Sequence, residues 1–254
     1  AFGEPKSYDL ARRPHPIFTP AARPEGTFNS RGAEPPYLIT ARSLAEYLAM
    51  FGLAEKDIRG RILDCPGGAA SFTAQACELG AEVVAVDPIY AAPAAEVAKH
   101  ALAEAGRSSA WTTASAARYV WDFYGDAAGH HDSRRAAAQR FATDIVAHPL
   151  RYIAASLPAL PFADNTFDLV LSSHLLFTYA DRLDLAFHVA ALTELARVSA
   201  GDVRVYPLVD HAGDRLDDLV AELRTELSRN GITSDIRPVE FEFQRGSNTM
   251  LVLE

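Results

Sequence analysis

The chain has 254 residues, enough for one domain with a full hydrophobic core, and 49% of them are hydrophobic while 22% are charged. Its net charge of −9 argues against a broad phosphate-binding surface. Its two cysteines are too few for a disulfide framework, and it lacks the run of about 18 apolar residues that a membrane span needs. We therefore expect a cytoplasmic protein that binds neither nucleic acid nor a membrane.

The composition divides the chain into parts. Residues 1–37 are rich in Pro and Gly and show no periodicity, which predicts an N-terminal arm over 1–40 with little regular structure. One domain is expected over 41–254. Residues 1–40 and residues 107–150 each hold five Lys or Arg against four Asp or Glu, so the remainder of the chain carries a net charge of −11.

Beyond the arm, strands and helices alternate. Helices are expected over 43–53, 70–80, 91–106, 184–198 and 215–231, and strands over 61–65, 81–87, 152–156, 167–173, 203–209, 236–243 and 248–254. The first helix has the capping-box pair Ser43 and Glu46. The repeated units predict a doubly wound, Rossmann-like α/β fold, with a mostly parallel seven-stranded sheet and an antiparallel C-terminal hairpin. Residues 107–150 interrupt this rhythm and predict an insertion of one or two helices.

A glycine pair marks the turn after the first strand. In the sequence LDCPGGAAS, residues 63–71, Gly67 and Gly68 allow the backbone to approach a ligand, and the start of the next helix offers free N–H groups. Asp87, at the end of the second strand, is placed to accept two ribose hydroxyls. These features suit either NAD or S-adenosylmethionine. Asp64 favours the second, because a carboxylate there repels a pyrophosphate and attracts an ammonium group.

The same loop resembles motif I of the class I S-adenosylmethionine-dependent methyltransferases, acid-x-Gly-x-Gly-x-Gly. Here the pattern reads DCPGGAA from Asp64, with Pro66 at the first glycine and Ala70 at the third. Three later stretches resemble further motifs in the family's order: VVAVD (83–87), SLPALPFADNTFDLVLSSHLLFTY (156–179) and ELARVSAGDVRVYPL (194–208). The resemblance covers residues 41–254 and implies methyltransferase activity with S-adenosylmethionine as the cofactor.

The resemblance also implies a set of cofactor-binding residues. The family often holds the adenine amino group with an Asp on the third strand, where this chain has Ser156, so that contact falls to Ser156 or to the backbone of Leu157. The implied set is Asp64, Pro66, Gly67, Gly68, Asp87, Pro88, Ser156, Leu157 and Ser173. The altered motif leaves open a scaffold protein that binds S-adenosylmethionine without transfer. An NAD-dependent oxidoreductase is the less favoured alternative.

Methyl transfer from a sulfonium needs little beyond alignment of the acceptor, although a base helps when the acceptor is a hydroxyl or an ammonium group. In this family the position just after the fourth strand faces the methyl group. His174 is therefore the candidate base, and Tyr179 is its candidate hydrogen-bonding partner. The adjacent residues His130 and His131 diverge on a helix and have no acidic cluster beside them, so we expect them on the surface and expect no metal site.

The arm and the insertion at 107–150 are the natural lid of the site. The insertion contains YVWDFY (119–124), where Trp121 and Tyr124 are candidates to contact the substrate; the alternative is that these aromatic residues pack a small subdomain. An enclosed site suits a ligand that is buried almost whole. We therefore predict methyl transfer to an O or N atom of a small-molecule acceptor. The sequence identifies neither that acceptor nor the oligomeric state.

Overall fold

The computed structural model describes residues 39–114 and 116–254, and the side chains of residues 107–116 are outside the description. The predicted arm therefore lies outside the described residues up to Leu38. Ile39 begins the unit that runs to Glu254, so the last two residues assigned to the arm belong to the body of the protein.

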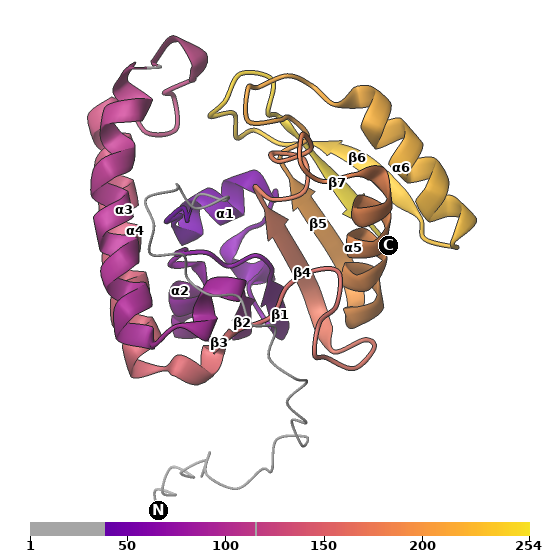
Figure 1. The fold of residues 1–254 in the computed structure, drawn as a ribbon, viewed down its shortest axis with the longest axis horizontal. Coiled ribbons are helices and arrows are strands. Elements are labelled where there is room, and N and C mark those ends of the chain that lie inside the picture. The colour runs from indigo at the N-terminus through magenta and orange to yellow at the C-terminus, as the bar shows by residue number, and fades with distance from the viewer. Residues whose placement is uncertain (1–38, 115) are drawn as a thin grey trace, which may run out of the picture. The chain divides into compact units, whose positions relative to one another are not determined.

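A seven-stranded sheet runs through this unit (Figure 1). In the order in which they lie side by side, its strands are β3 (Tyr152–Ile153), β2 (Glu82–Val86), β1 (Arg61–Asp64), β4 (Phe167–Ser173), β5 (Ser199–Tyr206), β7 (Thr249–Leu253) and β6 (Ser234–Pro238). The first five are parallel, whereas β7 is antiparallel to β5 and to β6. This arrangement confirms the predicted Rossmann-like fold. The strand order reverses at β1 and β4, where open α/β sheets bind their ligands.

Helices cover both faces of the sheet. They are α1 (Leu44–Met50), α2 (Phe72–Glu78), α3 (Ala94–Ala114), α4 (Ala127–Ala147), α5 (Leu185–Val198) and α6 (Asp217–Arg229). The apolar sides of α5 and α6 share a core with Leu63, and those of α1 and α2 share another with Ile62. Neighbouring residues of a strand point to opposite faces, so β1 is buried on both sides, as its apolar sequence predicts.

The predicted elements are present, but several of their ends differ from the structure, since β5 ends at Tyr206 instead of 209 and β6 ends at Pro238 instead of 243. The capping box of α1 is present, since the hydroxyl of Ser43 accepts from the N–H of Glu46 (3.3 Å) and the Glu46 carboxylate accepts from the N–H of Ser43 (2.8 Å). In contrast, β3 ends at Ile153. The prediction that Ser156 lies on this strand is wrong. Ser156 lies in a turn beyond β3, where it forms an isolated bridge with Ala159.

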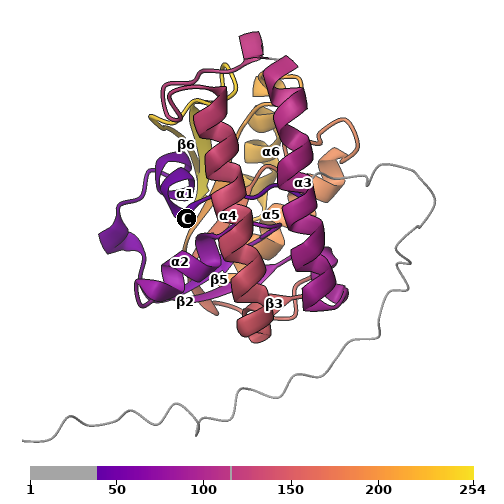
Figure 2. The same ribbon diagram turned by 90° about the vertical axis from the view of Figure 1, so that its left-hand side faces the viewer.

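The insertion forms a helical hairpin with α3, the helix that follows β2 in the alternation of strands and helices. α3 runs on to Ala114 instead of ending at 106, and α4 returns beside it (Figure 2). Small side chains line the contact between the two helices, including Ala101 on α3 and Ala138 on α4. The insertion therefore has no boundary at 107, because the first half of α3 belongs to the strand–helix rhythm and the second half to the hairpin.

Candidate active site

The loop after β1 has a backbone shape that requires its glycines. Gly68 has φ +53°, in the left-handed region. A Cβ on Gly67 would lie 2.6 Å from the Tyr90 hydroxyl and 2.8 Å from the Cβ of Ala85, so a side chain does not fit there. The Tyr90 hydroxyl also donates to the carbonyl oxygen of Gly68 (2.7 Å). The loop therefore keeps its close backbone packing although Pro66 stands at the first glycine of the motif.

Asp87 follows β2 and faces this loop. One of its carboxylate oxygens accepts from the N–H of Gly68 (3.1 Å) and the other from the N–H of Ile89 (3.0 Å). Burial raises the pKa of Asp87, and the two backbone hydrogen bonds oppose that rise. Each carboxylate oxygen has about two acceptor sites, so each keeps one for a ligand. In this respect the residues fit the paired ribose hydroxyls of S-adenosylmethionine.

Asp64 lies behind the loop and is fully buried. Both of its oxygens accept from the hydroxyl of Tyr47, at 2.9 and 3.1 Å. Burial raises the pKa of Asp64 well above its usual value, while the hydrogen bond from Tyr47 opposes the rise. Its predicted interaction with an ammonium group stays a prediction. Because Asp64 is buried behind the loop, this interaction would have to pass through a bridging group such as a water molecule. Sequence reasoning missed Tyr47, which has the appearance of an ordinary core residue of α1.

The other predicted cofactor residues lie around the ends of β1 to β4. Ser173 closes β4 and is buried, as is Leu157, whereas Pro88 and Ser156 are exposed. Pro66 is half-buried in the loop itself. Their predicted contacts with a cofactor stay predictions.

His174 is the first residue after β4 and has φ +54°, a backbone conformation that is uncommon outside glycine. Its Nδ1 atom is buried without a hydrogen-bond partner among the described residues. Burial lowers the pKa of His174 well below its usual value, and Arg42 and Arg134 lower it further. The imidazole is therefore neutral at neutral pH. Its predicted hydrogen bond with Tyr179 stays a prediction; the ring of Tyr179 lies 5.5 Å from the guanidinium carbon of Arg182.

Two hydroxyl groups near His174 share its lack of a partner. The side-chain oxygens of Ser172 and Thr178 are buried and unpaired within the part of the chain that the structure describes. Most buried polar groups in proteins are hydrogen-bonded. Three exceptions lie within residues 172–178, at and just after the end of β4.

The connection between α3 and α4 reaches the loops that follow β5 and β6. The N–H of Val120 donates to the carbonyl oxygen of Phe243 (2.7 Å), and the N–H of Arg245 donates to that of Arg118 (3.3 Å). The Arg118 guanidinium donates to the carbonyl oxygen of Ala212 (2.5 Å). Since β5 and β6 are both followed by these loops at the carboxyl side of the sheet, the connection lies on that side. Its role as a lid stays a prediction.

The predicted surface position of His130 is wrong. Its ring stacks on Phe243, with 4.6 Å between centroids, and meets the edges of Trp121 and Tyr124. Burial, followed by the charge of Arg134, lowers the pKa of His130 to about 3. The aromatic residues of the insertion thus pack a small cluster with the loop after β6. The predicted substrate contacts of Trp121 and Tyr124 are not tested by this packing.

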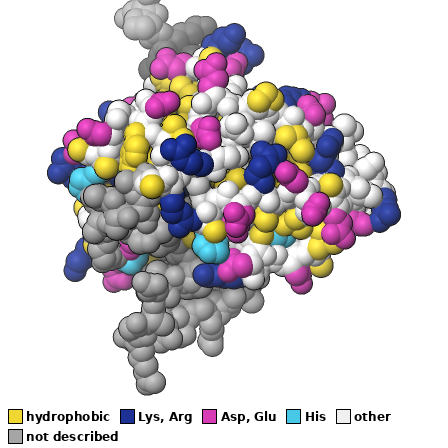
Figure 3. Space-filling view, turned by 90° about the horizontal axis from the view of Figure 1, so that it is seen from above, with side chains coloured by type: hydrophobic (Ala, Val, Ile, Leu, Met, Phe, Trp, Pro, Cys, Tyr) yellow, Lys and Arg dark blue, Asp and Glu magenta, His cyan; other side chains and the backbone are white. Residues whose placement is uncertain are grey.

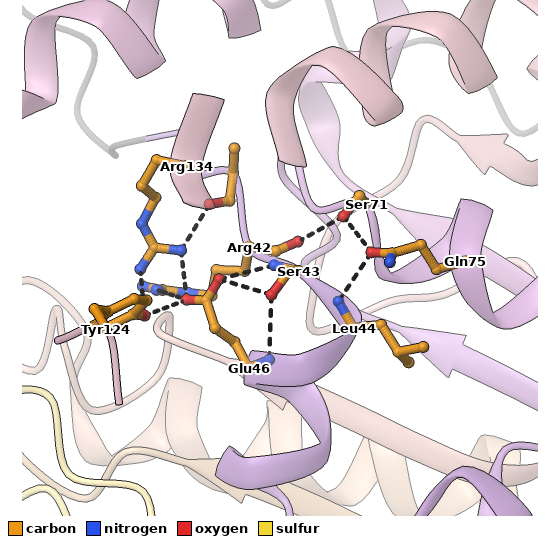
Figure 4. Close-up of polar contacts among 9 residues, drawn as sticks. Arg42, Ser43, Leu44, Glu46, Ser71, Gln75, Tyr124 and Arg134 are labelled. Carbon is orange, nitrogen blue, oxygen red and sulfur yellow. Dashed lines mark hydrogen bonds and ion pairs between the residues drawn. The ribbon is translucent and has the colours of Figure 1, made fainter. Parts of the chain in front are cut away.

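A buried ion pair fastens the insertion to α1 (Figure 4). The Oε1 atom of Glu46 accepts from Arg134 (2.5 Å) and from the hydroxyl of Tyr124 (2.6 Å). Burial alone would raise the pKa of Glu46, but Arg134 and Arg42 hold it below its ordinary value. Sequence reasoning assigned Glu46 only to a capping box, since nothing in the pattern pairs it with a residue 88 positions away.

The described surface at the top of Figure 1 carries charges of both signs. Basic and acidic side chains are interspersed over the described part of this face (Figure 3). No helix among the described residues is long and apolar enough to cross a membrane. The same residues contain no group of three or more metal-ligating side chains.

Comparison with known proteins gives matches to methyltransferases. The family model described as a methyltransferase domain matches residues 103–206, from α3 to the end of β5. An uncharacterised protein of Methanocaldococcus jannaschii is 24% identical over 220 residues, which are 85% of this chain and 95% of that protein.

Solved structures that resemble the chain include a magnesium protoporphyrin IX methyltransferase from Synechocystis PCC 6803 with bound S-adenosylmethionine (TM-score 0.43, 13% identity, 83% of this chain and 76% of the other). Another is an S-adenosylmethionine-dependent methyltransferase from Aquifex aeolicus (TM-score 0.40, 14% identity, 83% and 87%). The matched residues include β4, His174 and β5, and the glycine loop and Asp87 precede them in the chain. Residues 103–206 are therefore similar to the methyltransferase domain family.

Proposed function

We propose that the protein transfers the methyl group of S-adenosylmethionine to an O or N atom of a small-molecule acceptor. The observation that carries this proposal is Nδ1 of His174, which has no hydrogen-bond partner among the described residues and follows β4, next to the strand whose glycine loop faces Asp87. A ligand-binding loop and an unsatisfied basic nitrogen thus follow neighbouring strands at the point where strand order reverses.

The chain's own residues would divide the work between binding and proton transfer. Asp87 would accept the ribose hydroxyls with its remaining lone pairs, and Gly68 would let the backbone lie against the cofactor. When bound, S-adenosylmethionine supplies an electrophilic methyl group on a sulfonium. Nδ1 of His174 would accept the proton of the acceptor. Its neutral state suits that role, while its low pKa makes it a weak base, so alignment carries a large share of the rate.

A small acceptor is supported by charge and by the insertion. Interspersed charges on the described face offer no track for a phosphate backbone (Figure 3). The connection between α3 and α4, which contains Trp121 and Tyr124, reaches the loops beyond β5 and β6, where it would act as a lid. Such a lid would enclose an acceptor and exclude water.

The alternatives make different predictions for ligand binding. Unfolding midpoints should rise with S-adenosylhomocysteine and not with NADH, because a ligand stabilises in proportion to ln(1 + [L]/Kd). A rise with NADH alone would favour an oxidoreductase. Tight binding of S-adenosylhomocysteine without labelling of any acceptor, in a screen of metabolites with a radioactive methyl donor, would favour a scaffold. Efficient labelling of bulk RNA would overturn the small-molecule proposal.

A further inference from the structure

Two buried guanidinium groups share one carboxylate between α1 and α4 (Figure 4). Arg42, Arg134 and Glu46 are all more than nine-tenths buried. Arg134 lies 2.5 Å from Glu46 in an ion pair, but the nearest approach of Arg42 to Glu46 is 3.9 Å. The cluster therefore carries one positive charge in excess.

Glu46 has no acceptor site left for Arg42. Its Oε1 atom accepts from Arg134 and Tyr124, and its Oε2 atom accepts from the N–H of Ser43 (2.8 Å) and from the Ser43 hydroxyl (3.2 Å). A carboxylate offers about four lone-pair sites, and all four are occupied. The guanidinium of Arg42 consequently has no hydrogen-bond partner among the described residues. Buried charges in proteins are as a rule paired, because an unpaired one costs several kcal/mol.

The backbone of Arg42 is held next to the glycine loop. Its carbonyl oxygen accepts from the N–H of Ser71 (2.8 Å) and from the Ser71 hydroxyl (3.3 Å), just after the loop. Two residues earlier, the carbonyl oxygen of Thr40 lies 3.4 Å from where a Cβ on Gly68 would be. From this anchor the side chain runs to Glu46 and the insertion. It therefore links the edge of the cofactor loop to the proposed lid.

We propose that Arg42 binds an oxyanion of the methyl acceptor, a carboxylate or a phosphate, so that the substrates of this enzyme are acids. The guanidinium presents five donors in a planar fork, which matches such groups with two parallel hydrogen bonds. The inference rests on the proposed methyl transfer to a small molecule and adds the chemical class of that molecule.

Electrostatics agree with an anion on the acceptor side. Burial lowers the pKa of His174, and the charge of Arg42 lowers it further. The guanidinium of Arg42 therefore acts on the candidate base. An acid bound at Arg42 would also compensate the positive charge beside His174 and make the imidazole a better base.

The first test uses small anions as probes. Acetate, benzoate and inorganic phosphate are added to the whole chain at constant ionic strength, with and without saturating S-adenosylhomocysteine, and acetamide and benzamide serve as neutral counterparts. We expect at least one anion to raise the unfolding midpoint more than its neutral counterpart. In Arg42→Met its apparent Kd should weaken at least tenfold, and in the matched exposed variant Arg135→Met it should stay within twofold. No preference for any anion in the wild type would overturn the proposal.

The second test separates a binding role from a structural one and from a contact with the cofactor. Because Arg42 lies 3.9 Å from Glu46 without a hydrogen bond to it, Arg42→Met should leave the unfolding midpoint unchanged or higher, whereas Arg134→Met removes the hydrogen-bonded partner of Glu46 and should lower it. An equal drop in both variants would make Arg42 structural and overturn the proposal. A second result would also overturn the proposal: Arg42→Met binds S-adenosylhomocysteine at least tenfold more weakly but binds its decarboxylated analogue as the wild type does. The oxyanion at Arg42 would then be the carboxylate of the cofactor. Failure of the wild type to bind S-adenosylhomocysteine would instead overturn the proposed function.

Discussion

The carboxylate of Asp87 accepts a hydrogen bond from the N–H of Gly68 at 3.1 Å, which joins the acid after β2 to the glycine loop after β1. Asp87→Ala removes this bond and the predicted partner of two ribose hydroxyls, and each charge-assisted bond contributes roughly 1.5–3 kcal/mol. We expect calorimetry to show S-adenosylhomocysteine affinity weakened at least tenfold. Asp235→Ala, on the exposed strand β6, is the control. Unchanged affinity in a folded Asp87 variant would refute the assignment of this acid to the ribose.

His174 should be tested with asparagine, because asparagine tolerates the positive φ of this position better than alanine does. Loss of a general base costs about 10²–10⁴ in rate, so His174→Asn should lower kcat by that order and leave cofactor affinity within a few-fold. The lowered pKa keeps the imidazole deprotonated at and above pH 6.5, so kcat of the wild type should show no inflection there due to this group. Full kcat in the variant would make His174 structural and leave alignment as the mechanism.

Glu46 should matter more for stability than any exposed acid. Glu46→Gln leaves two buried guanidinium groups without their carboxylate, and breaking a buried pair in this way costs about 3–5 kcal/mol. Glu78→Gln removes an exposed partner of Arg140 and should cost at most about 1 kcal/mol. Denaturant unfolding of the two variants measures the difference. Equal losses would mean that the buried cluster contributes no more than a surface ion pair.

His130 makes the fold sensitive to acid. Its pKa is about 3 in the folded protein and near 6.5 in the unfolded chain, so between these values the unfolded state binds the additional proton. The free energy of unfolding should therefore fall as the pH falls from 7.5 to 5, and roughly 1–2 kcal/mol of that fall should come from this residue. His130→Phe keeps the aromatic packing and should show a smaller fall, while the exposed control His211→Gln should behave as the wild type. An identical pH dependence in His130→Phe would mean that this histidine is not the cause.

If the connection between α3 and α4 is a lid, its amide hydrogen exchange should change when a ligand binds. Few backbone hydrogen bonds join residues 118–124 to the loops after β5 and β6, so amide exchange there should be fast and should slow when S-adenosylhomocysteine binds. Exchange in β1 and β4 should change little, since both strands are buried within the sheet. The arm at 1–37 is expected to slow in the same way. Equal slowing throughout the chain would indicate general stabilisation and no closing segment.

The fold followed from the sequence because its signals are local. The Ser43–Glu46 capping box and the apolar run of β2 each depend on a few neighbouring residues, and both are present. The end of β3 was missed because a short edge strand ends where its neighbour β2 ends, which depends on tertiary contacts. The length of α3 was missed because an alanine-rich helix has no signal for its end until its partner α4 is known.

Only the glycine loop of the candidate site could be predicted from the sequence. Gly67 follows the first predicted strand and Asp87 ends the second, and in the structure both lie at the glycine loop. Arg42 and Arg134 lie 92 positions apart and belong to segments with no shared motif, so their meeting at Glu46 depends on how α4 docks. Tyr47 was not predicted for a similar reason, since its hydroxyl contacts Asp64 only after α1 has packed on the sheet.

The position of β7 has a consequence for how the chain folds. This strand follows β6 in the sequence yet lies between β5 and β6, and Leu253 on it pairs with both Val203 and Ser234. Before β7 arrives, β5 has a bare edge and β6 has no neighbour in the sheet. Closing the loop from β5 to β7 must precede any contribution from these pairings. Until the hairpin docks, β5 therefore presents an open edge of unpaired N–H and C=O groups on which another chain can pair, and the five-residue strand β7 is what covers this edge.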